Sequence, residues 1–167
     1  MKYDLIYADP PWSYQNKGTR AKAENHYPTM SLQEIKEFTV PAKDDAILFL
    51  WITSPLLPAG IEVMSAWGFI YKASCMWDKV IIGLGNYFRI RHEILLLGTR
   101  GKVPCPEPGD RFPSVITEKR TKHSKKPVMA YEIIEKMYPR LSKIELFARN
   151  MRSGWTSTGN EIVEKIS

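Results

Sequence analysis

Five short segments rich in apolar residues predict β-strands along the chain. These segments are residues 3–8, 46–52, 69–77, 92–101 and 143–148. The second of them, AILFLWI, is a continuous apolar run, and such a run is typical of a strand that is covered on both faces of a sheet. The pattern therefore predicts a sheet whose inner strands are buried.

Between the first two strands, apolar residues recur at the spacing of an α-helix. In SLQEIKEF they fall at Leu32, Ile35 and Phe38. Ser31 is suited to the N-cap position, and Glu34 completes a capping box with it. This segment is therefore predicted to be a short helix.

Two more helices are expected downstream. Residues 58–68 predict a short helix that a glycine closes. The clearest helix is residues 126–138, where Pro127 suits the first turn and Pro139 stops the helix. Its apolar stripe comprises Ala130, Ile133, Ile134, Met137 and Tyr138. Residues 155–166 predict a loop followed by a short terminal helix.

Strands that alternate with helices predict an α/β fold. The sheet is expected to be mostly parallel and flanked by helices, and residues 1–167 to form a single domain. Ligands of such sheets bind beyond the carboxyl ends of the strands. Asp9 to Trp12 follow the first predicted strand directly, which puts them where a site is expected.

The sequence DPPW, residues 9–12, forms a rigid turn at that place. Each proline fixes φ, removes a backbone donor and keeps the preceding residue out of helical space. Such a turn is either a structural stop or a preorganised site.

A preorganised DPPW turn suits the alkylation of an amino group on a nucleobase. The Asp9 carboxylate and the Pro10 carbonyl could accept the two N–H bonds of that amino group, which would free its lone pair in the transition state. Neither Pro10 nor Pro11 has an N–H that would compete. Trp12 offers a face on which an extruded base could stack, an interaction worth about 1–3 kcal/mol.

Composition and charge narrow the choice of partners. The formal net charge of +6 suits a polyanion. Lysine and arginine fill most of residues 119–126 (KRTKHSKK), which form either a solvated loop or a rim that grips phosphate beside a helix start. The cysteines and histidines lack metal-site spacing, so no metal is expected. The chain has no apolar run of membrane length and no signal peptide. We therefore expect a cytoplasmic protein that does not associate with a membrane.

Three further stretches join ADPPW in a pattern that resembles one known family. They are GLGNYFRIRHEILLLGTRG (83–101), HSKKPVMAYEIIEKMYP (123–139) and KIELFARNMRSGWTSTGNE (143–161). In this order, over nearly the whole chain, they are similar to the MT-A70-like family of adenine-N6 methyltransferases, in its compact phage and bacterial type. The resemblance implies S-adenosylmethionine as cofactor. It also implies a Rossmann-like methyltransferase fold in circularly permuted order, with the catalytic motif before the cofactor strand.

The resemblance assigns roles to individual residues. Asp9, Pro10, Pro11 and Trp12 would hold the target adenine, and Asp9 would also touch the amino group of the cofactor's methionine moiety. Some relatives bind the cofactor's adenine with an Asp in a segment upstream of this motif. Only a few residues precede Asp9 in this sequence, so that contact is expected near residues 151–153 or is expected to be weak.

Four more residues are implied to bind the cofactor, and three of them have a structural alternative. Lys126 would contact the cofactor or the acceptor adenine, or be a solvated residue before a helix. Arg149 would hold the cofactor's ribose, or be a surface ion-pair residue. Asn160 and Glu161 would also hold the ribose, unless Asn160 is a turn former.

Several basic residues are candidates for nucleic-acid binding. Arg89 and Arg91 could contact the backbone of the substrate, although Arg89, with His92 and Glu93, is rather expected to brace the sheet. Three more candidates lie in the basic run: Lys119, Arg120 and Lys122.

The main functional hypothesis is methyl transfer to the N6 amino group of adenine in DNA. RNA is the alternative polymer, and DNA is favoured because compact members without RNA-binding modules are of the phage and bacterial type. A cytosine-amino methyltransferase is less expected, since that chemistry usually carries Ser where Asp9 stands. A hypothesis of another class is a catalytically silent nucleic-acid-binding or partner subunit, which the intact DPPW disfavours. The loops 13–30 and 104–125 are expected to supply target recognition, with short or relaxed sequence choice or with help from a second subunit. A homodimer is the other expected assembly.

Overall fold

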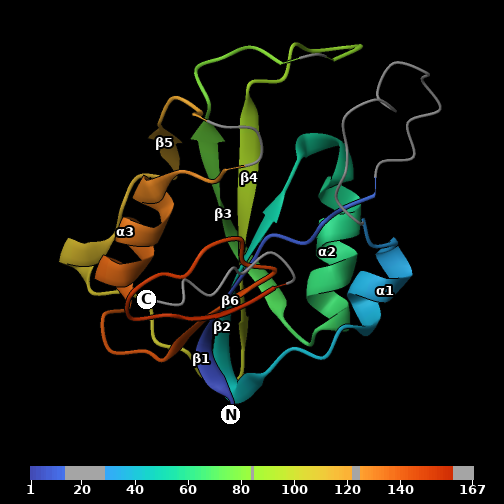
Figure 1. Ribbon diagram of the computed structural model, residues 1–167. Coiled ribbons are helices and arrows are strands. Elements are labelled where there is room, and N and C mark those ends of the chain that lie inside the picture. Colours follow the sequence, from blue (N-terminus) through green and yellow to red (C-terminus); the bar gives the residue numbers. More distant parts are fainter. Residues whose placement is uncertain (14–28, 84, 122–124, 160–167) are drawn as a thin grey trace, which may run out of the picture.

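In the computed structural model, the strands form one sheet with helices on both faces (Figure 1). The structure describes residues 1–13, 29–83, 85–121 and 125–159. Its strands are β1 (Tyr3–Ala8), β2 (Ala42–Ile52), β3 (Ile70–Asp78), β4 (His92–Arg100), β5 (Val115–Thr117), β6 (Lys143–Leu146) and β7 (Thr156–Thr158). Its α-helices are α1 (Leu32–Glu37), α2 (Leu57–Ala66) and α3 (Val128–Met137). Single turns of 3-10 helix occupy Ser54–Leu56 and Pro108–Asp110.

The strands follow the order β5-β3-β4-β2-β1-β6-β7. Strand β4 is antiparallel to its neighbours β2 and β3, and the remaining neighbouring pairs are parallel. The predicted mostly parallel sheet of a Rossmann-like methyltransferase fold is therefore confirmed. β1, which leads into DPPW, lies beside β6 although β6 comes near the end of the chain, as the permuted order requires.

Alternation along the central strands divides the core between the two faces. Leu5 and Tyr7 of β1 pack with Ile47, Phe49 and Trp51 of β2 and with the inner face of α3. The even-numbered residues between them pack with α1 and α2 on the opposite face. Successive side chains of a strand point to opposite faces, so Asp9 continues the α3 side of β1.

The helix start predicted at Ser31 is confirmed, whereas Pro127, which was predicted in the first turn of its helix, is the N-cap of α3. At α1, the Ser31 hydroxyl accepts from the Glu34 N–H, and the Glu34 carboxylate accepts from the Ser31 N–H at 2.7 Å. At α3, a residue distant in the sequence accepts hydrogen bonds from two N–H groups of the first turn. The Glu118 carboxylate accepts hydrogen bonds from the N–H groups of Val128 and Met129 at 3.1 and 3.0 Å.

Two strands were not predicted. β5 and β7 have three residues each and expose most of their side chains, so they lack the apolar signal of the inner strands. β7 lies in the segment that was expected to be a loop. The predicted terminal helix falls on residues outside the described ranges. No helix in the described part of the chain is long and apolar enough to cross a membrane.

Candidate active site at the carboxyl edge of the sheet

A chain of alternating charges begins at Asp9, the first residue after β1. The Asp9 carboxylate lies 3.0 Å from the ammonium nitrogen of Lys126, which directly precedes the N-cap of α3. Lys126 also lies 3.0 Å from the carboxylate of Glu93 at the start of β4. Glu93 in turn contacts Lys79, just after β3, at 3.2 Å. Four segments that are distant in sequence are thus tied together at one edge of the sheet.

The four charged groups that alternate in this way are largely buried. Burial and ion pairing shift the pKa values of Asp9, Lys126 and Glu93 in opposite directions. Burial raises the pKa of Asp9, and the nearby Lys126 opposes this shift. Burial alone would lower the pKa of Lys126, but Asp9 and Glu93 raise it above its ordinary value. Burial would raise the pKa of Glu93, yet Lys126 and Lys79 bring it below its ordinary value.

Lys126 is therefore a charged group held between two carboxylates, with 11% of its side chain exposed. The alternative that it is merely a solvated residue before a helix does not fit this burial. Its ammonium also lies 5.5 Å from the centre of the Trp51 ring, which adds a cation–π contact. The interpretation that Glu93 braces the sheet agrees with its two ion pairs.

Aromatic side chains lie beneath Asp9 on the α3 side of the sheet. The fully buried Trp51 donates its indole N–H to the Tyr7 hydroxyl. The Tyr7 ring lies 4.7 Å from the Tyr131 ring and 5.8 Å from the Trp155 ring, measured between centroids. No sequence motif marks these residues. Their signal was positional, because Tyr7 lies on the same face of β1 as Asp9.

A second buried carboxyl, that of Glu145 on β6, was also missed. Glu145 pairs in register with Tyr7, and its carboxylate accepts from the Tyr131 hydroxyl at 2.8 Å. Burial raises the pKa of Glu145 to about 7, while the Tyr131 hydrogen bond opposes the shift and the charge of Asp9 adds to it. A glutamate inside the apolar strand KIEL was the available signal.

The DPPW turn is held by its own backbone. The Trp12 N–H donates to the Pro10 carbonyl at 2.8 Å, and the Met30 N–H donates to the Pro11 carbonyl at 2.9 Å. One lone pair of the Pro10 oxygen is therefore already used. The Trp12 indole donates to the Trp51 carbonyl at 3.1 Å, and only 9% of Trp12 is exposed. Stacking of a base on Trp12 would require one face of this indole to be uncovered.

Of the predicted cofactor residues, Arg149 lies near the end of β6. Arg149 lies three residues beyond β6, and its charge lowers the pKa of Asp9, so the two side chains share one electrostatic environment. Gly159 lies against the backbone of this segment, since a Cβ there would be 2.4 Å from the Ala148 oxygen. Asn160 and Glu161 fall outside the described residues. Of the segment expected to contact the cofactor's adenine, Met151 is exposed, whereas Arg152 is paired with Glu135.

The candidate nucleic-acid residues are only partly placed. Arg91 forms an ion pair with Asp78, and Arg89 donates to the Gly83 carbonyl at 3.2 Å, so both brace the loop between β3 and β4. Lys119 and Arg120 are exposed, and Lys122 lies outside the described residues.

The expectation that the start of α3 attracts phosphate is wrong for two of its N–H groups, because Glu118 already accepts from them. Most of the loop 13–30, one of the two proposed recognition loops, lies outside the described residues.

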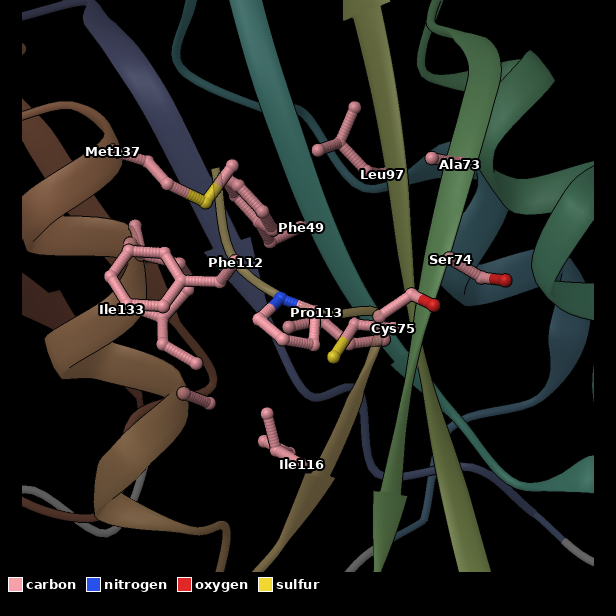
Figure 2. Close-up of a pocket in the computed structure, with 14 residues that line it drawn as sticks. Phe49, Ala73, Ser74, Cys75, Leu97, Phe112, Pro113, Ile116, Ile133 and Met137 are labelled. Carbon is pink, nitrogen blue, oxygen red and sulfur yellow. The ribbon is translucent and has the colours of Figure 1, made fainter. Parts of the chain in front are cut away.

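An apolar pocket lies apart from this site, between α3 and β3 (Figure 2). Ile133 and Met137 line it from α3, Cys75 lines it from β3, and Phe112 and Pro113 lie between them. Its volume is about 150 Å³, and no charged side chain lines it. Such a pocket has nothing with which to activate an amino group. Within the described ranges, no group of His, Cys, Asp and Glu side chains could hold a metal ion.

Known proteins match almost the whole chain. The MT-A70 family model matches residues 3–161. The Type II methyltransferase M.MunI from Mycoplasma sp is 38% identical over 182 residues, which cover 96% of this chain and 78% of that protein. The N(6)-adenosine-methyltransferase MT-A70-like of Arabidopsis thaliana is 31% identical, and the N(6)-adenosine-methyltransferase catalytic subunit METTL3 of Homo sapiens is 30% identical. This chain spans only 24% and 28% of those two proteins.

Proposed function

This chain belongs to the MT-A70 family, and we propose that it transfers a methyl group from S-adenosylmethionine to the N6 amino group of adenine in DNA. The observation that carries the proposal is the buried Asp9 carboxylate of an intact DPPW turn, held at 3.0 Å from Lys126. The continuous sheet from β1 to β7 supports the further proposal that residues 1–167 act as one methyltransferase domain.

Asp9 and Pro10 would act on the target amino group. The Asp9 carboxylate accepts one N–H of adenine, and the free lone pair of the Pro10 carbonyl accepts the other. Both contacts favour a tetrahedral nitrogen whose lone pair is available for attack. In a site of low dielectric constant, the carboxylate stabilises the positive charge that develops on this nitrogen. The methylated nitrogen is then acidic enough to lose its proton through Asp9 to water.

The described residues fit S-adenosylmethionine. When bound, it supplies an electrophilic methyl group on a sulfonium centre. The Asp9 carboxylate suits its ammonium group, and the Lys126 ammonium suits either its carboxylate or the acceptor adenine. Arg149 would hold the ribose from the end of β6, with Asn160 and Glu161. The close backbone approach at Gly159 supports this arrangement, because it brings the segment after β7 against the segment after β6.

DNA is favoured over RNA because of the pattern of identity. Type II methyltransferases are a class of DNA-modifying enzymes, and the chain is 38% identical to one of them. It is 31% and 30% identical to the two adenosine methyltransferases, which support RNA as the second candidate. A silent binding subunit is disfavoured, because the DPPW motif is unaltered and its Asp9 forms an ion pair with Lys126.

The test is direct analysis of the methylated product. The purified protein is incubated with labelled S-adenosylmethionine and either DNA or RNA of mixed sequence, and the nucleosides are separated by mass spectrometry. We expect N6-methyldeoxyadenosine, and no label with Asp9→Ala. Label in cytosine, or label in RNA alone, would contradict the proposal. Titration of the cofactor by calorimetry separates a silent subunit, which should give no binding heat.

A further inference from the structure

The loop between β3 and β4 carries the most exposed aromatic side chains of the described chain. Tyr87 is 97% exposed and Phe88 is 83% exposed, and Ile82 of the same loop is 58% exposed. In Figure 1 this loop extends beyond the ends of β3 and β4. Contiguous exposed apolar side chains of this kind mark an interaction site.

This loop is braced rather than loose. The Lys79 N–H donates to the Arg91 carbonyl and the Gly83 N–H to the Ile90 carbonyl, both at 2.8 Å. A Cβ at Gly85 would lie 2.0 Å from the Phe88 oxygen, so only glycine allows the close crossing of the two arms there. The sequence therefore builds a narrow ribbon that presents the two rings at its tip.

The base of the same ribbon is tied to the candidate active site. Lys79 and Glu93 flank it, and Glu93 contacts Lys126, which contacts Asp9. Because β3 runs parallel to β1, the ribbon leaves the sheet at the edge where Asp9 lies. The exposed Arg120 is adjacent, since its N–H donates to the Lys79 carbonyl at 3.3 Å. Basic residues at the base of a ribbon with an aromatic tip favour a polyanion over an apolar protein surface as its partner.

We propose that residues 79–83 and 85–91 contact the nucleic acid, and that Tyr87 and Phe88 stack on bases next to the target adenine. The inference rests on the proposed function for its substrate. An extruded base leaves a gap in the stack, and exposed rings can fill such a gap or cover the bases beside it. Lys79 is hydrogen-bonded to Arg91 at the base of the ribbon, and four residue steps separate Arg91 from Tyr87, so the tip reaches at most about 14 Å from that base. This reach corresponds to about four nucleotides along a strand, measured from the base of the ribbon.

The first test measures binding of a labelled mixed-sequence DNA duplex by fluorescence anisotropy at several salt concentrations, without cofactor. Tyr87→Ala and Phe88→Ala should each raise Kd by about 5- to 150-fold, because each removes one stacking ring. Phe88→Trp should bind like the parent protein. The slope of log Kd against log salt should not change, because no charge is lost. The matched control is Ile70→Ala, at an exposed apolar residue (67%) at the opposite end of β3. Variants of the tip that behave like this control would overturn the proposal.

The second test identifies what the tip touches. A photo-crosslinking benzoylphenylalanine is placed at position 88, and the protein is irradiated with the same duplex. Cross-links to the duplex support the proposal, whereas cross-links only to a second copy of the chain overturn it. The methyl-transfer assay is run separately on the parent protein. Duplex binding that depends on the tip, without methyl transfer by the parent protein, would contradict the proposed function and leave the loop contact standing.

Discussion

Two buried carboxyl groups lie near Asp9 in opposite electrostatic surroundings. Glu93, on the β4 side, contacts Lys126 and Lys79, and despite burial its pKa is below the ordinary value. Glu145, on the β6 side, contacts the Tyr131 hydroxyl, and burial raises its pKa to about 7. Burial is common to both, so the difference comes from the partner. A lysine keeps a buried carboxyl charged, whereas a tyrosine leaves it able to take up a proton near neutral pH.

The largest effect is expected from removing the group that lies between the two carboxyls. Asp9→Ala should lower methylation by at least about a thousandfold, because the charge stabilisation of the transition state is lost. Asp9→Asn keeps an acceptor oxygen and should lose less. Initial rates with labelled cofactor measure both variants, and calorimetry should show that cofactor affinity falls far less than the methylation rate, because only one of the proposed cofactor contacts is lost. Methylation by Asp9→Ala at the parent rate would refute the catalytic assignment.

The next effect comes from making Glu93 resemble Glu145. Lys126→Met removes the cation between Asp9 and Glu93 and should destabilise the protein by about 3–5 kcal/mol, since two carboxylates are left buried. The pKa of Glu93 should rise. The pKa of Glu145 should hardly change, because Lys126 is not among the charged groups that shift it. Urea unfolding and NMR titration of the carboxyl carbons measure the two effects. The exposed Lys119→Met is the control, and an equal loss of stability in it would contradict the special role of Lys126.

A smaller effect is expected from removing the titration of Glu145. Its pKa is about 7 in the folded protein against 4.5 ordinarily, so the folded state binds the proton more tightly than the unfolded state. This contribution to stability is full below about pH 4.5 and is lost as pH rises through 7, by up to about 3 kcal/mol. Glu145→Gln keeps an acceptor for Tyr131 and should flatten that fall relative to the parent protein. Urea unfolding at pH 5 and about pH 8 compares the two, and parallel pH profiles would show that Glu145 does not titrate there.

Trp51 contacts both the lysine side and the tyrosine side of the site, because its ring faces Lys126 and its N–H donates to Tyr7. Its carbonyl accepts from the Trp12 indole, so Trp12→Phe should cost about 1–2 kcal/mol through the lost hydrogen bond. Trp12→Ala should cost more and, if the ring also stacks on a base, raise the Kd for a duplex. Unfolding and anisotropy measurements separate these roles. Unchanged duplex binding by folded Trp12→Ala would remove the stacking role.

The smallest effect is expected from exposed charges, in contrast to the buried ones. Replacement of Lys119, Arg120 and Lys122 by Ala should weaken duplex binding and lower the salt slope by roughly one unit per lost phosphate contact. Cofactor affinity should not change, because the buried Lys126 is untouched. Anisotropy at several salt concentrations provides the measurement. An unchanged slope would indicate that this segment is a solvated loop that does not contact phosphate.

The contrast between local and distant information explains what the sequence could predict. The inner strands and the Ser31 capping box follow from local patterns, and all were found. β5 and β7 are short and exposed, so no local pattern marks them. Asp9 and Lys126 were each selected, but their ion pair joins residues far apart in the chain. Glu145 was missed because its environment depends on Tyr131, which α3 brings against β6.

The position of β1 has a consequence for how the protein is made. β1 leaves the ribosome well before β6, yet it pairs with both β2 and β6, and β6 begins only at Lys143. One edge of β1 therefore stays without its native partner until β6 has been synthesised. Pairing across such a sequence separation slows folding and leaves a strand edge open to wrong partners. Asp9 would thus be translated well before its partner Lys126, and the site would be completed late in folding.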